Sequence, residues 1–232
     1  MRFRPISPDL FVDELADLLT DSLTDSLTDS LTDSLGDSLG DGTAGGWLRV
    51  ALDGAPAARP EWLADALVDP LRIRGRETIR VSAWDFLRPA SVRFEHGKTN
   101  PDARYADWLD VNAVHREVLR PLEPGGTGEV LPALWDTSID RAVRAARLPV
   151  PASGVLLLDG ELLLGRGLRF DHTVHLWLSS GALDRLTPEE QRWALPAYQR
   201  YEREVDPCRA ADTVLRVDDP DHPAVRLPGE DT

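Results

Sequence analysis

The sequence contains little cysteine and little lysine. Cys208 is the only cysteine among 232 residues, which excludes an internal disulfide and a metal site built from several thiolates. Lys98 is the only lysine among 26 basic residues, so arginine must supply nearly every cationic side chain. Any side-chain contact with a phosphate is therefore expected to come from arginine.

Positive charge and long apolar runs are also scarce. The formal net charge is -14 and the sequence pI is near 4.7. Nucleic acids and anionic membranes bind through basic surfaces, so neither is expected as a partner. The best apolar run, 155–164, is interrupted by Asp159, Gly160 and Glu161, and residues 1–8 lack the apolar core of a signal peptide. We therefore expect a cytoplasmic protein.

Residues 1–18 carry the pattern of a helix. Ser7 is followed by Pro8 and Asp9, which suit a helix cap and first turn, and apolar residues then recur at helical spacing. A Leu-Thr-Asp-Ser repeat follows and dissolves into glycine by residue 46. Its weak helix propensity favours an acidic low-complexity linker over residues 19–46, partly helical or disordered.

The alternative for this repeat is an oligomerisation or docking helix through which the chain self-associates. In a helix, a four-residue period rotates the leucine stripe by roughly 40° per repeat. Such a stripe cannot face one partner helix throughout, so a sustained coiled coil is not expected.

Residues 47–220 are expected to form one domain, with a disordered tail at 221–232. Short apolar runs alternate there with helical patterns, and several runs are continuously apolar, as in strands buried on both faces of a parallel sheet. This alternation predicts an α/β fold with an open, mostly parallel sheet flanked by helices on both faces. The predicted strands are 47–52, 78–83, 155–158, 173–178 and 213–217, and the predicted helices are 61–68, 105–119 and 188–204.

Three distinctive dipeptides end predicted strands: Asp53-Gly54, Trp84-Asp85 and Asp159-Gly160. Ligands of open α/β sheets bind beyond the carboxyl ends of the strands. We therefore expect these loops to converge on one crevice.

The stretch from Asp53 to Glu61 has the outline of a phosphate-binding loop without its key residues. A working loop needs Gly-Lys-Ser/Thr before the helix, because backbone N–H groups and the lysine hold the phosphates and the hydroxyl holds magnesium. Those positions carry Arg59, Pro60 and Glu61. Pro60 supplies no N–H, whereas Arg59 either reaches a phosphate as a fork donor or is a solvated surface arginine.

The order of motifs over residues 48–219 resembles the uridine kinase and phosphoribulokinase branch of the P-loop kinases. The loop described above comes first, in the form of a degenerate Walker A motif. It is followed by Ser82-Ala83-Trp84-Asp85-Phe86, by Tyr105-Ala106-Asp107-Trp108-Leu109-Asp110, and by an apolar strand ending in Asp159-Gly160-Glu161. The resemblance implies a P-loop NTPase-like sheet and ATP-dependent, Mg²⁺-dependent phosphorylation of the 5′-hydroxyl of a pyrimidine nucleoside.

The resemblance also implies roles for individual residues. Gly54 and Arg59 fall in the phosphate loop, and Arg185 and Arg192 match lid arginines that contact the ATP phosphates. The substrate side is assigned to three residues: Asp110 at the ribose hydroxyls, and Trp135 and Arg141 at the base.

Two carboxylates are candidates for the chemistry. The family's general base is the first Asp of an Asp-Asp-Phe turn, and Trp84 stands at that position, so the base role passes to Asp85, one residue later. The alternative for Asp85 is a turn or capping aspartate. Asp159 ends an apolar strand, where it either binds magnesium or forms a turn with Gly160. Asp53 is interpreted as structural.

The remaining histidines and tryptophans offer few site residues. His172 and His175 are three apart on a predicted strand and so point to opposite faces, which argues against a shared metal. Most of the seven tryptophans are expected in the core. Trp84 and Trp135 are the exceptions, because both fall at the predicted crevice.

Two functions follow from these residues. The first is a uridine kinase-like phosphotransferase. The second is a catalytically silent relative that binds a nucleoside, a nucleotide or a protein partner. The joint replacement of the lysine, the hydroxyl and the base at Pro60, Glu61 and Trp84 favours the second, because phosphoryl transfer depends on the charge these groups supply.

Overall fold

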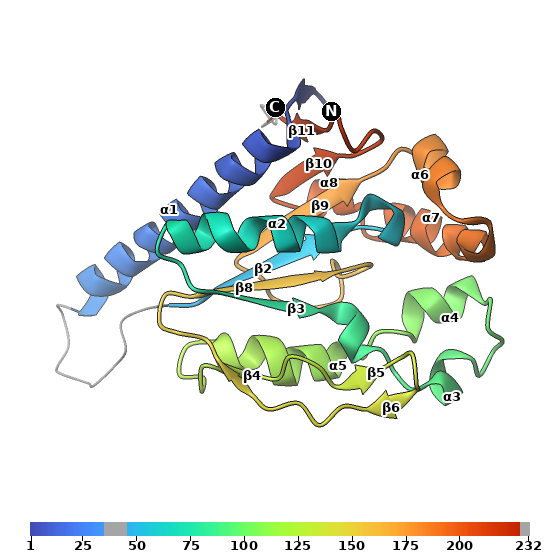
Figure 1. Ribbon diagram of the computed structural model, residues 1–232, viewed down its shortest axis with the longest axis horizontal. Helices are drawn as coiled ribbons and strands as arrows, with labels where there is room; N and C mark the ends of the chain where they lie inside the picture. The colour runs from blue at the N-terminus through green and yellow to red at the C-terminus, as the bar shows by residue number, and fades with distance from the viewer. Residues whose placement is uncertain (35–45, 228–232) are drawn as a thin grey trace.

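The computed structural model describes residues 1–34 and 46–227, and within them one twisted sheet crosses the molecule (Figure 1). Its seven strands have the order β1-β11-β10-β9-β2-β8-β3. These are β1 (Phe3–Pro5), β2 (Leu48–Asp53), β3 (Thr78–Ser82), β8 (Val155–Gly160), β9 (His172–Trp177), β10 (Thr213–Arg216) and β11 (Ala224–Arg226). Two small antiparallel pairs stand apart from it: β4 (Glu129–Val130) with β7 (Leu148–Pro149), and β5 (Trp135–Asp136) with β6 (Arg141–Ala142).

The helical elements connect and cover these strands. The α-helices are α1 (Pro8–Ser34), α2 (Pro60–Ile73), α3 (Ala90–Arg93), α4 (Pro101–Ala106), α5 (Val111–Val114), α6 (Ser180–Leu186), α7 (Leu195–Glu204) and α8 (Pro207–Ala210). Shorter turns are η1 (Pro56–Ala58), η2 (Ala83–Phe86), η3 (His115–Leu119), η4 (Arg120–Leu122) and η5 (Glu189–Ala194).

The centre of the sheet is parallel. Strand β8 pairs in parallel with both β2 and β3, and β9 pairs in parallel with both β2 and β10. Antiparallel pairing is confined to the edge formed by β11 and β1. The predicted fold class, an open and mostly parallel sheet with helices on both faces, is confirmed, and each of the five parallel strands overlaps a predicted range.

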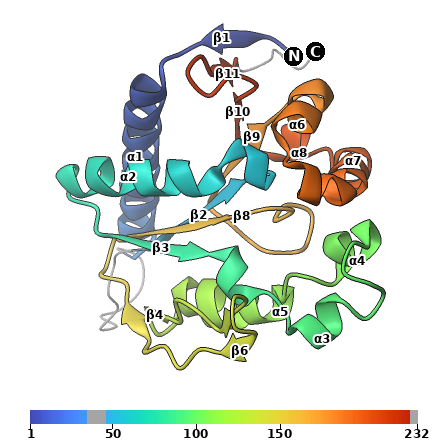
Figure 2. The same ribbon diagram turned by 45° about the vertical axis from the view of Figure 1, so that its right-hand side comes forward.

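Each face of the sheet has its own apolar core because side chains alternate along a strand. In β8, Val155 and Leu157 pack with α1 and α2, whereas Leu156 and Leu158 pack with α5, η3 and α7. Figures 1 and 2 show α1 and α2 together on one side of the sheet, with α5 on the other. Burial on both faces explains why these strands read as continuous apolar runs.

Helix α1 is built into the first of these cores. Phe11, Leu15 and Leu19 are buried in it. On the surface, the Arg74 guanidinium donates to the carboxylates of Asp13 and Asp17, at 2.7 Å in each case. The helix continues to Ser34, across the boundary predicted at residue 18. None of the helices in the described part of the chain is long and apolar enough to cross a membrane.

Three predictions about segments need correction. Residues 224–226 form β11, although a tail was expected; the strand is too short to show a periodicity, and one of its partners, β1, lies at the other end of the chain. The predicted helix 105–119 is divided, because Asp110 caps a new helix at α5. Residues 19–34 of the predicted linker continue α1, and residues 35–45 lie outside the described residues.

We predict that α1 is essential for stability. Replacing Phe11, which is 2% exposed, by alanine should cost about 3–5 kcal/mol of unfolding free energy, because it leaves a cavity between α1 and the sheet. Leu10→Ala changes a neighbour that is 48% exposed and should cost less than about 0.5 kcal/mol. Urea unfolding of the two variants measures both values, and equal losses would contradict the packing of α1 described here.

Candidate functional site

The loops that follow β2, β3 and β8 meet at one edge of the sheet, as predicted from their strand order. The N–H of Gly54 donates to the carbonyl of Gly160 at 3.0 Å. A Cβ on Gly160 would come within 2.5 Å of the Ala83 side chain, so only glycine allows the loop after β8 to pack this closely on η2. The three loops therefore form one crevice floor.

The loop from Gly54 to Glu61 is closed on itself. The N–H of Ala58 donates to Ala55 (2.8 Å), and the N–H of Arg59 donates to Pro56 (3.0 Å). Proline at positions 56 and 60 removes two further donors. Of the backbone N–H groups that a phosphate-binding loop directs at its ligand, two are therefore bonded within the turn and two are missing.

Nevertheless, the residue just before α2 has a backbone conformation that glycine adopts readily. Arg59 has φ 58° and ψ 56°, a left-handed conformation that is costly for residues other than glycine. Its side chain is exposed. Pro60 is buried in the first turn of α2, and the exposed Glu61 puts a negative charge at the helix N-terminus, where an anion would otherwise bind.

Asp159 is held by protein groups at the end of β8. It is 1% exposed, and its Oδ1 accepts a hydrogen bond from Arg80 Nε at 2.9 Å. Its Oδ2 accepts one from Ser82 Oγ at 3.0 Å. Arg80 also pairs with Asp65 of α2. The Arg80 guanidinium therefore already compensates the negative charge that Asp159 would otherwise offer to a metal ion.

Asp85 lies in η2 and is partly buried. Burial raises its pKa above the ordinary aspartate value, and the negative charges of Asp159 and Asp136 raise it further, against a smaller opposing effect of Arg80. The two predicted catalytic carboxylates are thus neighbours in the crevice. No group of three or more His, Cys, Asp or Glu side chains within residues 1–34 and 46–227 has the arrangement of a metal site.

The predicted substrate residues have structural partners. Asp110 caps α5 by accepting the Ala113 N–H at 2.9 Å. Trp135 donates its indole N–H to Asp140 (3.0 Å), and Arg141 is exposed on β6. The β5–β6 hairpin reaches the crevice through its first strand, because the N–H of Leu134 donates to the carbonyl of Asp85 at 2.9 Å.

The two predicted lid arginines bind backbone of their own region. Arg185 donates to the carbonyl of Asp218 at 3.0 Å. Arg192 donates to the carbonyl of Asp184 and pairs with Glu189, at 3.4 Å and 3.3 Å. In the described part of the chain, neither guanidinium has a hydrogen bond or ion pair to residues 54–61, although α6, which carries Arg185, packs against η1 of that loop.

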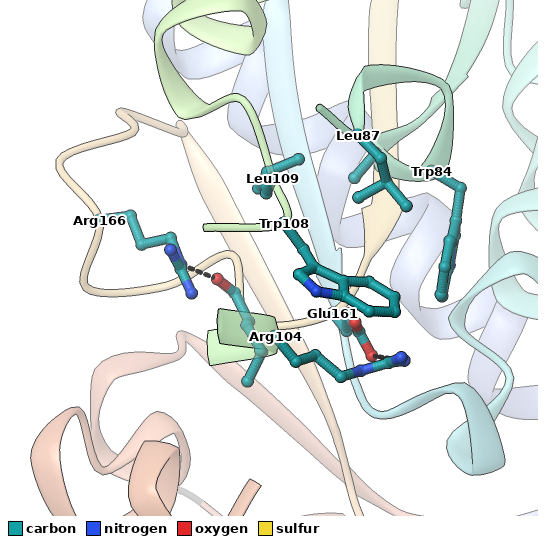
Figure 3. Close-up of a pocket in the computed structure, with 9 residues that line it drawn as sticks. Trp84, Leu87, Arg104, Trp108, Leu109, Glu161 and Arg166 are labelled. Carbon is teal, nitrogen blue, oxygen red and sulfur yellow. Dashed lines mark hydrogen bonds and ion pairs between the residues drawn. The ribbon is translucent and has the colours of Figure 1, made fainter. Parts of the chain in front are cut away.

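A pocket opens beside this crevice, beyond the ends of β3 and β8 (Figure 3). We call it the indole pocket. Its apolar walls include the rings of Trp84 and Trp108, and its charged groups are Arg104, Glu161 and Arg166. The full lining is Ala83, Trp84, Leu87, Arg104, Trp108, Leu109, Glu161, Leu162 and Arg166.

Arg104 is the central charge of the indole pocket. Its guanidinium carbon lies 4.7 Å from the ring centre of Trp108 and about as close to two other indoles, 5.5 Å from Trp84 and 5.4 Å from Trp193. Arg104 donates to Glu161 at 2.9 Å, but its buried Nε has no hydrogen bond. The Arg104 guanidinium, which lines the pocket, therefore has one hydrogen-bond donor without a partner.

Arg166 contributes a second guanidinium on the opposite wall. It donates to the carbonyls of Leu162 and Tyr105, and burial lowers its pKa below the ordinary arginine value. Two guanidinium groups therefore face one carboxylate, so the pocket carries a net positive charge inside an acidic protein.

No protein family model matches the chain, and no curated protein matches it. Solved structures do match. A possible uridine kinase from Bacillus stearothermophilus superposes with a TM-score of 0.61 at 20% identity, covering 83% of this chain and 98% of that one. D-glycerate 3-kinase from Cryptococcus neoformans superposes with a TM-score of 0.53 at 14% identity, covering 84% and 80%. The chain has the fold of the P-loop kinases.

Within the P-loop kinase fold, the described crevice combines residues that the sequence indicated with residues it did not. Trp84 lines the pocket as expected of a tryptophan at the crevice, and Trp108, expected in the core, lines it as well. No sequence motif indicated Arg104 or Arg166. Glu161 could have been suspected, because it directly follows the strand-end pair Asp159-Gly160.

We predict that Asp85→Asn stabilises the protein at neutral pH. A raised folded-state pKa means that the folded chain binds the Asp85 proton more tightly than the unfolded chain does. This contribution to stability is present below the ordinary aspartate pKa and is lost as the pH rises through the raised value. Asparagine cannot ionise, so the variant should gain on wild type at pH 7 and match it at acidic pH.

Urea unfolding at a series of pH values measures this difference. Asp69→Asn, which changes an exposed aspartate on α2, is the matched control and should show no such pH dependence. Equal stability of the two variants at pH 7 would show that burial and acidic neighbours do not destabilise the ionised form of Asp85.

Proposed function

We propose that this chain binds a nucleoside or nucleotide in the indole pocket and does not transfer phosphate from Mg-ATP. The observation that carries the proposal is the loop from Gly54 to Glu61, in which the N–H groups of Gly54, Ala58 and Arg59 are bonded within the protein and Pro56 and Pro60 have none. Phosphoryl transfer is mostly positioning and electrostatic stabilisation. A loop that lacks the lysine and the hydroxyl, and in which several N–H groups are missing or already bonded, offers little of either.

The environment of Asp159 supports the same proposal. In a kinase that uses magnesium, an acidic side chain at this strand end helps to hold the ion. Here Arg80 already supplies the positive charge, and breaking a buried ion pair to admit a metal is costly. The residues present therefore do not fit Mg-ATP.

The indole pocket supports the choice of ligand. Trp84 and Trp108 give the pocket apolar walls beside Arg104, whose guanidinium carbon lies 5.5 Å and 4.7 Å from their ring centres, and the apolar part of a base could pack against these walls. Arg104 and Arg166 suit a ligand rich in acceptor atoms or carrying a phosphate. The predicted base-side residues Trp135 and Arg141 lie on the hairpin beside Asp85, at the margin of the same crevice.

An active uridine kinase-like enzyme is the second candidate. It is favoured by the order of the sequence motifs and by Asp85, a partly buried carboxylate with a raised pKa that suits a general base. In that case Asp85 would take the proton of the substrate hydroxyl, and Arg59 would have to replace the missing lysine.

We predict that calorimetric titration with Mg-ATP gives no saturable binding to the natural chain. The triple variant R59G/P60K/E61S restores the phosphate-loop residues and should bind Mg-ATP, which would stabilise it by about 2.7 kcal/mol at one hundred times its Kd. Adding Asp159→Ala to the triple variant is the control for a metal contribution. Turnover of uridine or cytidine by the natural chain with Mg-ATP would overturn the proposal in favour of the kinase.

We also predict binding of uridine monophosphate to the natural chain, followed by tryptophan fluorescence. Arg166→Met should weaken it about tenfold, because a charge-assisted hydrogen bond is worth about 1.5–3 kcal/mol. Arg169→Met removes an exposed arginine three residues away and should leave the affinity unchanged. If neither uridine nor its monophosphate alters the fluorescence, the indole pocket is not a nucleoside site.

A further inference from the structure

The two guanidinium groups of the indole pocket differ in how their charges are compensated. Arg166 donates hydrogen bonds to two backbone carbonyls, those of Leu162 and Tyr105, and forms no ion pair with a carboxylate of residues 1–34 or 46–227. The Tyr105 ring, 5.3 Å from the guanidinium carbon, adds only a weak attraction. Carbonyl groups satisfy N–H donors but carry no negative charge, so the positive charge of Arg166 has no counterion.

Arg104 is paired only in part. Its guanidinium and the Tyr198 hydroxyl donate to the same carboxylate oxygen of Glu161, at 2.9 Å and 2.5 Å. The Arg104 side chain is 5% exposed, and its Nε has no hydrogen-bond partner in the described part of the chain. The three surrounding indoles attract the charge, but a π face accepts a hydrogen bond far more weakly than an oxygen does. A buried donor without a partner is costly, so this one indicates a ligand acceptor.

The charged lining of the indole pocket therefore has an excess of positive charge. Arg104 and Arg166 each carry one positive charge, and Glu161 carries the negative charge opposite them (Figure 3). A neutral ligand could accept a hydrogen bond from Arg104 Nε but would leave the excess charge in place. An anionic group meets both needs, because its oxygens accept charge-assisted hydrogen bonds and its charge offsets the excess.

The surroundings limit how much negative charge the ligand can carry. A phosphate monoester carries about 1.5 to 2 negative charges at pH 7. The further phosphates of a triphosphate would need more cationic groups. Residues 54–61, at the adjoining crevice, contain neither the lysine nor the hydroxyl that serve those phosphates in a working loop. The pocket therefore matches a monophosphate better than a triphosphate.

We propose that Arg104 and Arg166 select the ligand by its charge, so that the indole pocket takes a nucleoside monophosphate in preference to a nucleoside. Arg104 Nε donates to a phosphate oxygen, and Arg166 supplies the second positive charge. The apolar walls beside them, which include Trp84 and Leu109, are left for the nucleoside part. This inference rests on the function proposed above, and it adds which form of the ligand is bound and which residues determine the choice.

A series of ligands tests the selection without altering the protein. Uridine, uridine monophosphate, uridine triphosphate and inorganic phosphate are titrated without magnesium at pH 7, and binding is followed by tryptophan fluorescence. The monophosphate should bind at least tenfold more tightly than each of the other three.

The outcomes of this series separate the inference from the proposed function. Equal affinity for uridine and its monophosphate would overturn the charge selection and leave the nucleoside site in place. Absence of binding by both would overturn the proposed function together with the inference. The selection of a nucleoside monophosphate would also be wrong if inorganic phosphate or the triphosphate bound as tightly as the monophosphate.

Two variants test the assigned residues. Arg104→Lys keeps the charge but removes the Nε–H, and Arg166→Met removes a charge; each should weaken binding of the monophosphate about tenfold and leave uridine binding unchanged. Arg169→Met, at an exposed position, should change neither. The ratio of the two affinities is the readout, because a merely structural change lowers both equally. If Arg104→Lys does not fold, Arg166→Met decides, and an unchanged ratio in that variant would overturn the inference.

Discussion

The architecture of the crevice depends on how two buried carboxylates at the ends of adjacent central strands are compensated. Asp53 ends β2 and points toward α7, where it accepts from His175 and Tyr201; Asp159, near the end of β8, points toward α2, where Arg80 compensates it. Burying a charge is tolerated only with such partners. The partners come from β9, α7 and β3, so compensation of these two groups ties most of the sheet to its covering helices.

This arrangement also separates two electrostatic environments that lie side by side. The indole pocket has an excess of guanidinium groups, and a second hollow, on the other side of Leu162, has the Glu202 carboxylate and no lysine or arginine in its lining. Leu162 stands between them with φ 56°, a strained conformation for leucine. Because a side chain in this position lines both spaces, the loop after β8 is the physical boundary between the guanidinium-rich pocket and the hollow that contains Glu202.

Much of the fold could be predicted from the sequence, because strands buried on both faces leave continuous apolar runs and parallel strands end at a common edge. The same reasoning placed Asp85 and Asp159 in one crevice. It could not provide the pairing of Asp53 with His175, which depends on the register of β2 with β9. Nor could it place Arg104 among three indoles, since those rings come from η2, from the segment after α4 and from η5.

Arg59 shows that a loop can have a glycine-like backbone turn before its helix without the phosphate-binding residues. Its left-handed conformation costs a non-glycine residue roughly 1–2 kcal/mol, yet the turn is retained between a central strand and a helix that are packed in place. A consequence is that similarity of fold and similarity of sequence motifs separate in this chain, because solved structures match its fold while no family model matches its sequence.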